Sequence, residues 1–245
     1  MQVQIERVSK KFGGLKALDS VSLIAKSGEV TALIGPNGAG KSTLINCLTG
    51  IFGIDSGSIV INDREFNRIY PHQLIEIGIA RTFQNIRVWD HLSVAEHIVL
   101  ARQSYHRSGR AKKGPSDRDI RAYAIKILSR LGLGSKADRR PDQLSYGERR
   151  RLEIARGLAT QPDVLLLDEP AAGFTLSEQS NLADLILEIA AEAIAVILVE
   201  HHMDLVAKVS AKVVVLNFGS VIVTGTPAEI RTHPEVISAY LGVSA

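Results

Sequence analysis

The feature that most constrains this chain is a glycine-rich run, GPNGAGKST, which begins at Gly35 and ends at Thr43. It fits the pattern G-x-x-x-x-G-K-[ST], which is typical of a phosphate-binding loop. The apolar residues 30–34 predict a buried parallel strand before the loop, and residues 43–48 predict a helix after it. In that context, backbone N–H groups and the helix N-terminus can surround phosphate oxygens. The sequence therefore predicts a site for the phosphates of a nucleotide.

The positions within this loop have separate predicted tasks. Lys41 is expected to reach the β- and γ-phosphates, and the Ser42 hydroxyl is expected to bind Mg²⁺. The other positions are expected to contribute backbone contacts. The predicted phosphate-binding set is Gly35, Pro36, Asn37, Gly38, Ala39, Gly40, Lys41, Ser42 and Thr43.

A second apolar run, at residues 164–167, ends in Asp168 and Glu169. A strand that is apolar on both faces belongs inside a parallel sheet, and ligands bind at the carboxyl ends of such strands. Asp168 is therefore predicted to hold Mg²⁺ together with Ser42. Glu169 is predicted to polarise an attacking water as the general base. Without the phosphate loop, the same strand end would be equally typical of a surface turn.

Composition limits the class of protein. The chain has 245 residues, of which 45% are hydrophobic, and this is enough for one large domain with smaller lobes. A net charge of +3 gives no argument for a nucleic-acid partner. The one cysteine, Cys47, excludes an internal disulfide and is expected to be a small buried apolar residue. We find no signal peptide and no run of the ~20 apolar residues that crossing a bilayer requires.

Strands that alternate with helices along the chain predict a parallel α/β core. Residues 2–26 predict antiparallel strands that turn at Gly13-Gly14, and residues 91–140 predict a helical insertion. Within the insertion, residues 102–121 are rich in Arg, Lys, Ser and Gly. We interpret them as a solvated loop, with a membrane-facing patch as the alternative.

The run LSYGE contains a helix start. Ser145 followed by Glu148 is the pattern of a capping box, and the helix that it opens carries Leu152, Ala155 and Leu158 on one face. Taken alone, the run indicates only a well-capped helix. Its position some twenty residues before Asp168 favours a functional role in addition to helix capping.

Together these motifs resemble those of the ATP-binding subunits of ABC transporters, over essentially the whole chain. GPNGAGKST looks like their Walker A motif and VLLLDEP like their Walker B motif. LSYGE is similar to their signature LSGGQ, with Tyr146 in place of a glycine and Glu148 in place of a glutamine. The resemblance implies one ABC domain at residues 1–245. Its expected fold is an α/β P-loop NTPase core with a mostly parallel sheet, an antiparallel β lobe and a helical lobe at about residues 85–155.

The resemblance also implies roles for residues that carry no signal alone. Gln84 matches the glutamine that contacts Mg²⁺ and couples to the membrane subunit. His201 matches the histidine that contacts the γ-phosphate, with its neighbour His202 as the alternative. Phe12 matches the aromatic residue that stacks on adenine, with a packed edge aromatic as the alternative. The family's dimer implies that Ser145 and Gly147 contact the ATP that is bound to the second subunit.

Shorter runs narrow the resemblance. RTFQNIR, EPAAG and HPEVISAYLG look like the ATPases of branched-chain amino-acid importers. This implies a peripheral subunit on the cytoplasmic face of the cell membrane that uses ATP and Mg²⁺. Its expected partners are permease subunits, a second identical or different ATPase subunit and, indirectly, a substrate-binding protein, with no nucleic acid. The alternatives are urea or amide import, lipopolysaccharide export, a non-transport ABC ATPase and a metabolic P-loop kinase.

Two positions depart from the family pattern. Residues 174–176 read Phe-Thr-Leu where the family has Leu, then Asn or Asp, then Pro. This loop meets the other subunit, so the change bears on coupling and not on nucleotide binding. His202 stands where these importers carry Asp.

Overall fold

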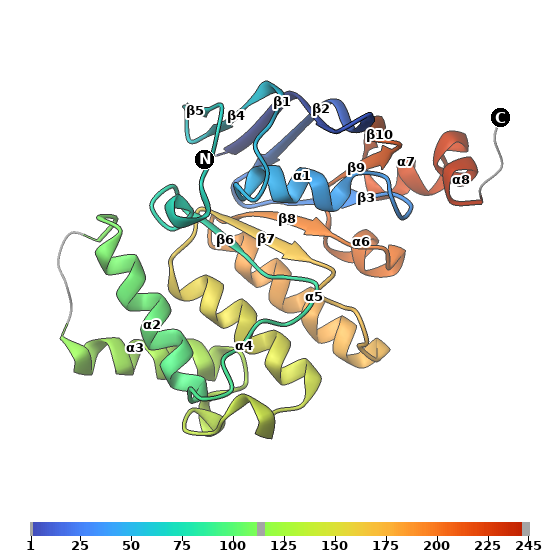
Figure 1. Cartoon of the computed structure of the whole chain (residues 1–245). Coiled ribbons are helices and arrows are strands. Elements are labelled where there is room, and N and C mark those ends of the chain that lie inside the picture. Colours follow the sequence, from blue (N-terminus) through green and yellow to red (C-terminus); the bar gives the residue numbers. More distant parts are fainter. Residues whose placement is uncertain (1, 112–115, 242–245) are drawn as a thin grey trace.

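The computed structural model describes residues 2–111 and 116–241, which form two sheets and several surrounding helices (Figure 1). The strands are β1 (Gln2–Phe12), β2 (Leu15–Lys26), β3 (Val30–Ile34), β4 (Ser56–Ile61), β5 (Arg64–Phe66), β6 (Ile79–Arg81), β7 (Val164–Asp168), β8 (Ala195–Val199), β9 (Lys212–Asn217) and β10 (Ser220–Gly225). The α-helices are α1 (Lys41–Leu48), α2 (Val94–Arg107), α3 (Asp117–Arg130), α4 (Tyr146–Ala159), α5 (Leu176–Ala191), α6 (Met203–Val209), α7 (Pro227–Thr232) and α8 (Pro234–Leu241). Short 3₁₀ turns are η1 (Pro71–Gln73), η2 (Gly134–Lys136) and η3 (Pro141–Gln143).

The larger sheet has six strands in the order β10-β9-β3-β8-β7-β6, and all neighbours except β10 and β9 are parallel. Its central strands β3, β7 and β8 are buried along their whole length. Side chains alternate between the two faces. In β8, Ile197 and Val199 belong to the core beneath α1, whereas Val196 and Leu198 belong to the core formed with α4 and α5. The predicted parallel α/β core is confirmed.

The smaller sheet is antiparallel, in the order β2-β1-β4-β5, and it covers α1 (Figure 1). The chain turns between β1 and β2 at Gly13-Gly14, as predicted. Val21 and Leu23 of β2 share a buried cluster with Leu44 and Leu48 of α1. Helix α1 is therefore enclosed between the two sheets, and its N-terminus, where the phosphate loop ends, is held in place from both sides.

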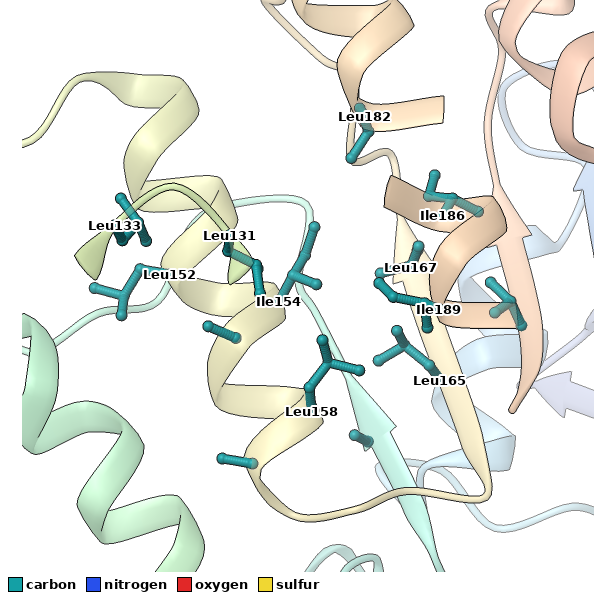
Figure 2. Close-up of a cluster of buried hydrophobic side chains, with 14 of the residues drawn as sticks. Leu131, Leu133, Leu152, Ile154, Leu158, Leu165, Leu167, Leu182, Ile186 and Ile189 are labelled. Carbon is teal, nitrogen blue, oxygen red and sulfur yellow. The ribbon is translucent and has the colours of Figure 1, made fainter. Parts of the chain in front are cut away.

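Helices α2, α3 and α4 form a separate helical lobe (Figure 1). Each is preceded by a capping serine, Ser93, Ser116 or Ser145, whose hydroxyl accepts from the backbone N–H three residues on. Figure 2 shows that α4 spans two environments: Leu152 lies beside Leu133 of the lobe, while Leu158 lies toward Leu165 of β7. Thus α4 connects the lobe to the sheet.

The interpretation of residues 102–121 as a loop is wrong at both ends. Residues 102–107 belong to α2 and residues 117–121 to α3, while residues 112–115 lie outside the described part. Arg and Lys are good helix formers, so a basic composition does not break a helix. The guanidinium of Arg102 also lies 4.6 Å from the ring centre of Tyr105 and 4.1 Å from that of Tyr123, which joins α2 to α3.

The register of the parallel strands gathers their carboxyl ends at one edge of the sheet. Leu33 of β3 pairs with Val199 of β8, and Val199 pairs with Asp168 of β7. The segments that follow these strands contain the phosphate loop, Glu169 and His201. Three motifs that are far apart in sequence therefore leave the sheet side by side.

Candidate nucleotide site

A cavity of about 500 Å³ opens at this edge of the sheet. It brings together the phosphate loop, the predicted adenine contact and two predicted catalytic side chains. Its lining is Phe12, Leu15, Lys16, Ala17, Asn37, Gly38, Ala39, Gly40, Lys41, Ser42, Thr43, Gln84, Glu169, Phe218 and Gly219. Residues 15–17, at the start of β2, and the pair 218–219 carried no signal in the sequence.

The backbone of the phosphate loop requires its glycines. Gly35 has φ 146°, and a Cβ there would lie 2.1 Å from the carbonyl oxygen of Leu216. Gly40 has φ 105° and precedes α1 without a side chain that could cap it. The first N–H groups of α1 therefore face the cavity without a capping side chain, which suits an anion.

Lys41 lies over this loop. Its Nζ donates to the carbonyl oxygens of Gly35 and Pro36, at 2.6 and 3.0 Å. Burial lowers the pKa of Lys41, and the carboxylates of Glu169 and Asp168 oppose that shift. The ammonium is thus bound to the anion-binding loop, and the charges of the two carboxylates favour its protonated form.

Asp168 ends β7 with its side chain almost fully buried. Its Oδ2 accepts from Nη2 of Arg81 at 2.9 Å, and Nη1 of Arg81 donates to Asn46 and Thr49 on the α1 side. The structure thus adds Arg81 to the predicted residues. The only signal for it in the sequence is its position three residues before Gln84.

Glu169 follows with φ 45°, an uncommon conformation for a residue with a side chain. Its N–H donates to the carbonyl oxygen of Val199 at 2.9 Å, and its Oε2 accepts from Nε2 of Gln84 at 2.9 Å. The structure therefore joins the predicted base directly to the predicted coupling glutamine. That bond does not use the amide oxygen of Gln84.

The donor set fits magnesium. The Ser42 hydroxyl, the Asp168 carboxylate and the Gln84 amide oxygen are the hard oxygen ligands that Mg²⁺ prefers. Ser42 and Gln84 line the same cavity, and Asp168 directly precedes the lining residue Glu169.

His201 and His202 lie on the neighbouring strand end and share one buried carboxylate. Oε2 of Glu200 accepts from the backbone N–H groups of both histidines and lies 2.9 Å from Nδ1 of His202. The side chain of His201 is 51% exposed, whereas that of His202 is turned to Glu200. This favours His201 as the residue free to meet a ligand.

Ser145 and Gly147 do not line the nucleotide cavity. Ser145 caps α4, because its hydroxyl accepts from Glu148 N–H while the Glu148 carboxylate accepts from Ser145 N–H. Gly147 lines a different cavity, beside Phe174 and Glu178. Within one chain, these two residues are therefore separate from the other predicted ATP contacts.

The departures from the family pattern have structural partners. Thr175 caps α5, and its hydroxyl accepts from Glu178 N–H as an Asn or Asp side chain could. Tyr146 and Phe174 meet edge to face, with ring centres 6.4 Å apart. The two unusual aromatic residues thus pack on each other.

Phe12, at the end of β1, lines the cavity and is partly exposed. Its ring meets Phe52 edge to face, with centres 5.0 Å apart. This contact fixes the ring while leaving part of its surface toward the cavity. The structure adds one aromatic residue that the sequence did not predict for this site, Tyr240 of α8. Its hydroxyl oxygen accepts a hydrogen bond from Gly35 N–H at 3.0 Å.

Comparison with known proteins agrees with this geometry. Residues 18–172 match the family described as "ABC transporter", and residues 220–245 match "Branched-chain amino acid ATP-binding cassette transporter". The chain is 40% identical over 240 residues to a high-affinity branched-chain amino acid transport ATP-binding protein, LivG, of Salmonella typhimurium, covering 95% of this chain and 94% of that protein.

Solved structures are similar as well. The ADP conformation of MJ1267, an ATP-binding cassette of an ABC transporter, matches with a TM-score of 0.88 and 32% identity over 99% of both chains. A dimeric post-hydrolysis state of the cassette MJ0796, bound to ADP and Pi, matches with a TM-score of 0.80 and 26% identity over 92% of this chain and 98% of that one. With the phosphate loop and the DEP strand end in place, this chain belongs to the ABC transporter family as an ATP-binding cassette.

Proposed function

We propose that this chain hydrolyses ATP to drive import of branched-chain amino acids through an ABC transporter. The observation that carries the proposal is the bond between Gln84 and Glu169, two side chains that line the same cavity as the phosphate loop. The substrate class rests on two similarities, to the LivG protein and to the family matched at residues 220–245.

Binding follows from the loop. The N–H groups of residues 38–43 and the start of α1 are the contacts for the phosphates, and Phe12 offers a ring face to the base. Lys41 exchanges its bonds to loop carbonyls for the β- and γ-phosphates. Ser42, Asp168 and Gln84 would hold Mg²⁺, which neutralises phosphate charge when it is bound.

Hydrolysis follows from Glu169. Its carboxylate accepts a proton from the attacking water, and Gln84 orients that carboxylate through their shared hydrogen bond. His201 contacts the γ-phosphate, and its backbone is fixed by the hydrogen bond from its N–H to the Glu200 carboxylate. The ion pair with Arg81 keeps Asp168 in place beside Glu169.

Completion of the site requires a second subunit. Ser145 and the N-terminus of α4 lie outside the cavity, so they are proposed to contact the ATP of a partner, as MJ0796 forms a dimer with ADP and Pi. ATP then holds two subunits together, and the release of phosphate opens them.

The membrane partner is proposed to dock beside the helical lobe. Among the described residues, none of the helices has the length and apolar character needed to cross a bilayer. A mainly apolar cavity of about 310 Å³ lies between the lobe and the sheet, with exposed Ile51, Trp89 and Leu100 at its walls. A permease segment that fills it would place this subunit at the cytoplasmic face of the membrane.

Uptake in cells tests the proposed cargo. In a strain whose own branched-chain importer ATPase is deleted, this chain, expressed with its permease and binding protein, should restore uptake of labelled leucine. Lys41→Ala should not restore it. Uptake of labelled urea without uptake of leucine would contradict the proposed cargo, while the proposal that the chain is a transport ATPase would stand.

A further inference from the structure

Helix α4 is tied to the segment around Gln84 by a buried ion pair. Arg150 and Glu153, one helical turn apart, are both fully buried, and Nη1 of Arg150 lies 2.9 Å from Oε2 of Glu153. Buried charges of this kind are costly to separate. We call these two residues the α4 clamp.

The α4 clamp binds the backbone of the segment at Phe83 and Gln84. Arg150 donates from Nη1 to the carbonyl oxygen of Phe83 at 2.5 Å and from Nη2 to that of Gln84 at 2.8 Å. Oε1 of Glu153 accepts from Phe83 N–H at 3.2 Å. Three backbone polar groups of the segment are thus bound to one helix. A planar guanidinium is suited to hold two acceptors at once.

The residue immediately before this segment is bound to the sheet instead. Thr82 N–H donates to the carbonyl oxygen of Leu166 at 2.9 Å, and its hydroxyl accepts from Asp168 N–H at 3.2 Å. The chain therefore passes from the sheet to α4 between Thr82 and Phe83. Gln84 has its backbone bound to α4 and its side chain bound to Glu169 of the sheet edge.

The same helix is capped by Ser145, five residues before Arg150, or about 7 Å along the axis. At its other end α4 rests on the sheet, where a Cβ at Gly157 would lie 3.4 Å from Leu165. A displacement of the Ser145 end against this fixed end moves the α4 clamp, and with it the backbone of Gln84.

We propose that Arg150 and Glu153 are positioning residues that transmit occupancy of one ATP site to the other. ATP on the partner subunit engages Ser145, α4 shifts, and the α4 clamp adjusts Gln84 against Glu169 in this subunit's own site. The inference rests on the proposed function, because only the dimer brings Ser145 to a nucleotide.

The test isolates this route in a mixed dimer. One subunit carries Lys41→Ala, so that its own site is empty, and a fluorescent dye at Asn85→Cys beside Gln84. Cys47 is buried and should not take the dye. The other subunit is unlabelled and carries Glu169→Gln, which retains ATP. Dye emission on addition of ATP then reports only the nucleotide that faces the labelled subunit's Ser145.

Arg150→Lys in the labelled subunit keeps the charge but replaces the planar guanidinium, whose Nη1 and Nη2 each bind a different carbonyl, with one ammonium on a shorter side chain. We expect the ATP-induced change in emission per dimer to be lost, and the hydrolysis rate of the otherwise unmodified protein to fall about 2- to 30-fold, with unchanged affinity of the monomer for ATP. Arg149→Lys is the matched control, since the side chain of Arg149 donates to the carbonyl oxygens of Leu144 and Asp142 and, among the described residues, makes no hydrogen bond to the Gln84 segment. Glu153→Gln should act like Arg150→Lys, and thermal melting identifies any variant that fails to fold.

The outcomes separate the two proposals. An emission change that persists in Arg150→Lys and Glu153→Gln dimers overturns the role of the α4 clamp, and so does an equal loss in Arg149→Lys. If no dimer forms with ATP by size-exclusion chromatography, the proposed dimeric function fails, and this inference fails with it.

Discussion

Nη2 of Arg81 lies 2.9 Å from Oδ2 of Asp168, and both side chains are at least nine-tenths buried. The predicted magnesium ligand is therefore half of an ion pair that joins β6 to β7. Removal of either partner leaves a buried charge without its counter-charge. Asp168 thus has a structural task in addition to its proposed chemical one.

Arg81→Met should lower the free energy of unfolding by about 3–5 kcal/mol, because it leaves the buried Asp168 carboxylate without its counter-charge. Urea unfolding followed by circular dichroism measures this. Arg121→Met is the matched control, since the Arg121–Asp138 pair is 59% and 83% exposed and should matter by less than about 1 kcal/mol. Equal losses in the two variants would contradict the argument.

Lys41→Ala should abolish tight binding of ATP, because it removes the cation that lies over the phosphate loop. Equilibrium binding with Mg²⁺ measures it, with Lys26→Ala, at the exposed end of β2 and outside the cavity lining, as the control. Unchanged affinity in Lys41→Ala would refute the assignment of the loop.

Phe12 should give poor discrimination between bases, since every base has a face that can stack. ATP and GTP are expected to bind within about tenfold of one another, or about 1.4 kcal/mol. Competition between the two nucleotides measures the ratio. A strong ATP preference that survives Phe12→Ala would show that another residue reads the base.

Cys47 should be inert in the folded protein. Burial raises the pKa of its thiol to about 11, so the thiolate is rare at pH 8. The unfolded chain ionises this thiol near its ordinary pKa while the folded chain does not. Its contribution to stability therefore falls as pH rises above about 9. A thiol reagent at pH 8 should react only after denaturant is added; rapid reaction with the native protein would contradict this.

The local motifs could be predicted because residues that are adjacent in the sequence determine their geometry. The phosphate loop, the DEP strand end and the Ser145 capping box each lie within a few positions, and the structure has them where the patterns predict. Family resemblance added Gln84, and the structure joins it to Glu169.

What could not be predicted depends on distant parts of the chain. Arg150 meets the Gln84 carbonyl 66 positions away, and the Tyr240 hydroxyl meets Gly35 N–H across 205 positions. No short pattern encodes such pairs. The prediction of a loop at residues 102–121 was wrong for a different reason. Charged side chains indicate that a segment is exposed to solvent, but they do not indicate whether its backbone is helical. The helix depends on its caps and on buried residues such as Leu128.

The central claim is that Glu169 is the base of an ATP site that is completed by a second subunit. Glu169→Gln keeps the shape of the side chain and removes its charge, so ATP should still bind while hydrolysis slows by about 10²–10⁴. Size-exclusion chromatography of this variant with ATP and Mg²⁺, alone and with its native partner ATPase, should show a dimer that is absent without ATP. Wild-type turnover with no ATP-dependent dimer in either sample would contradict the account.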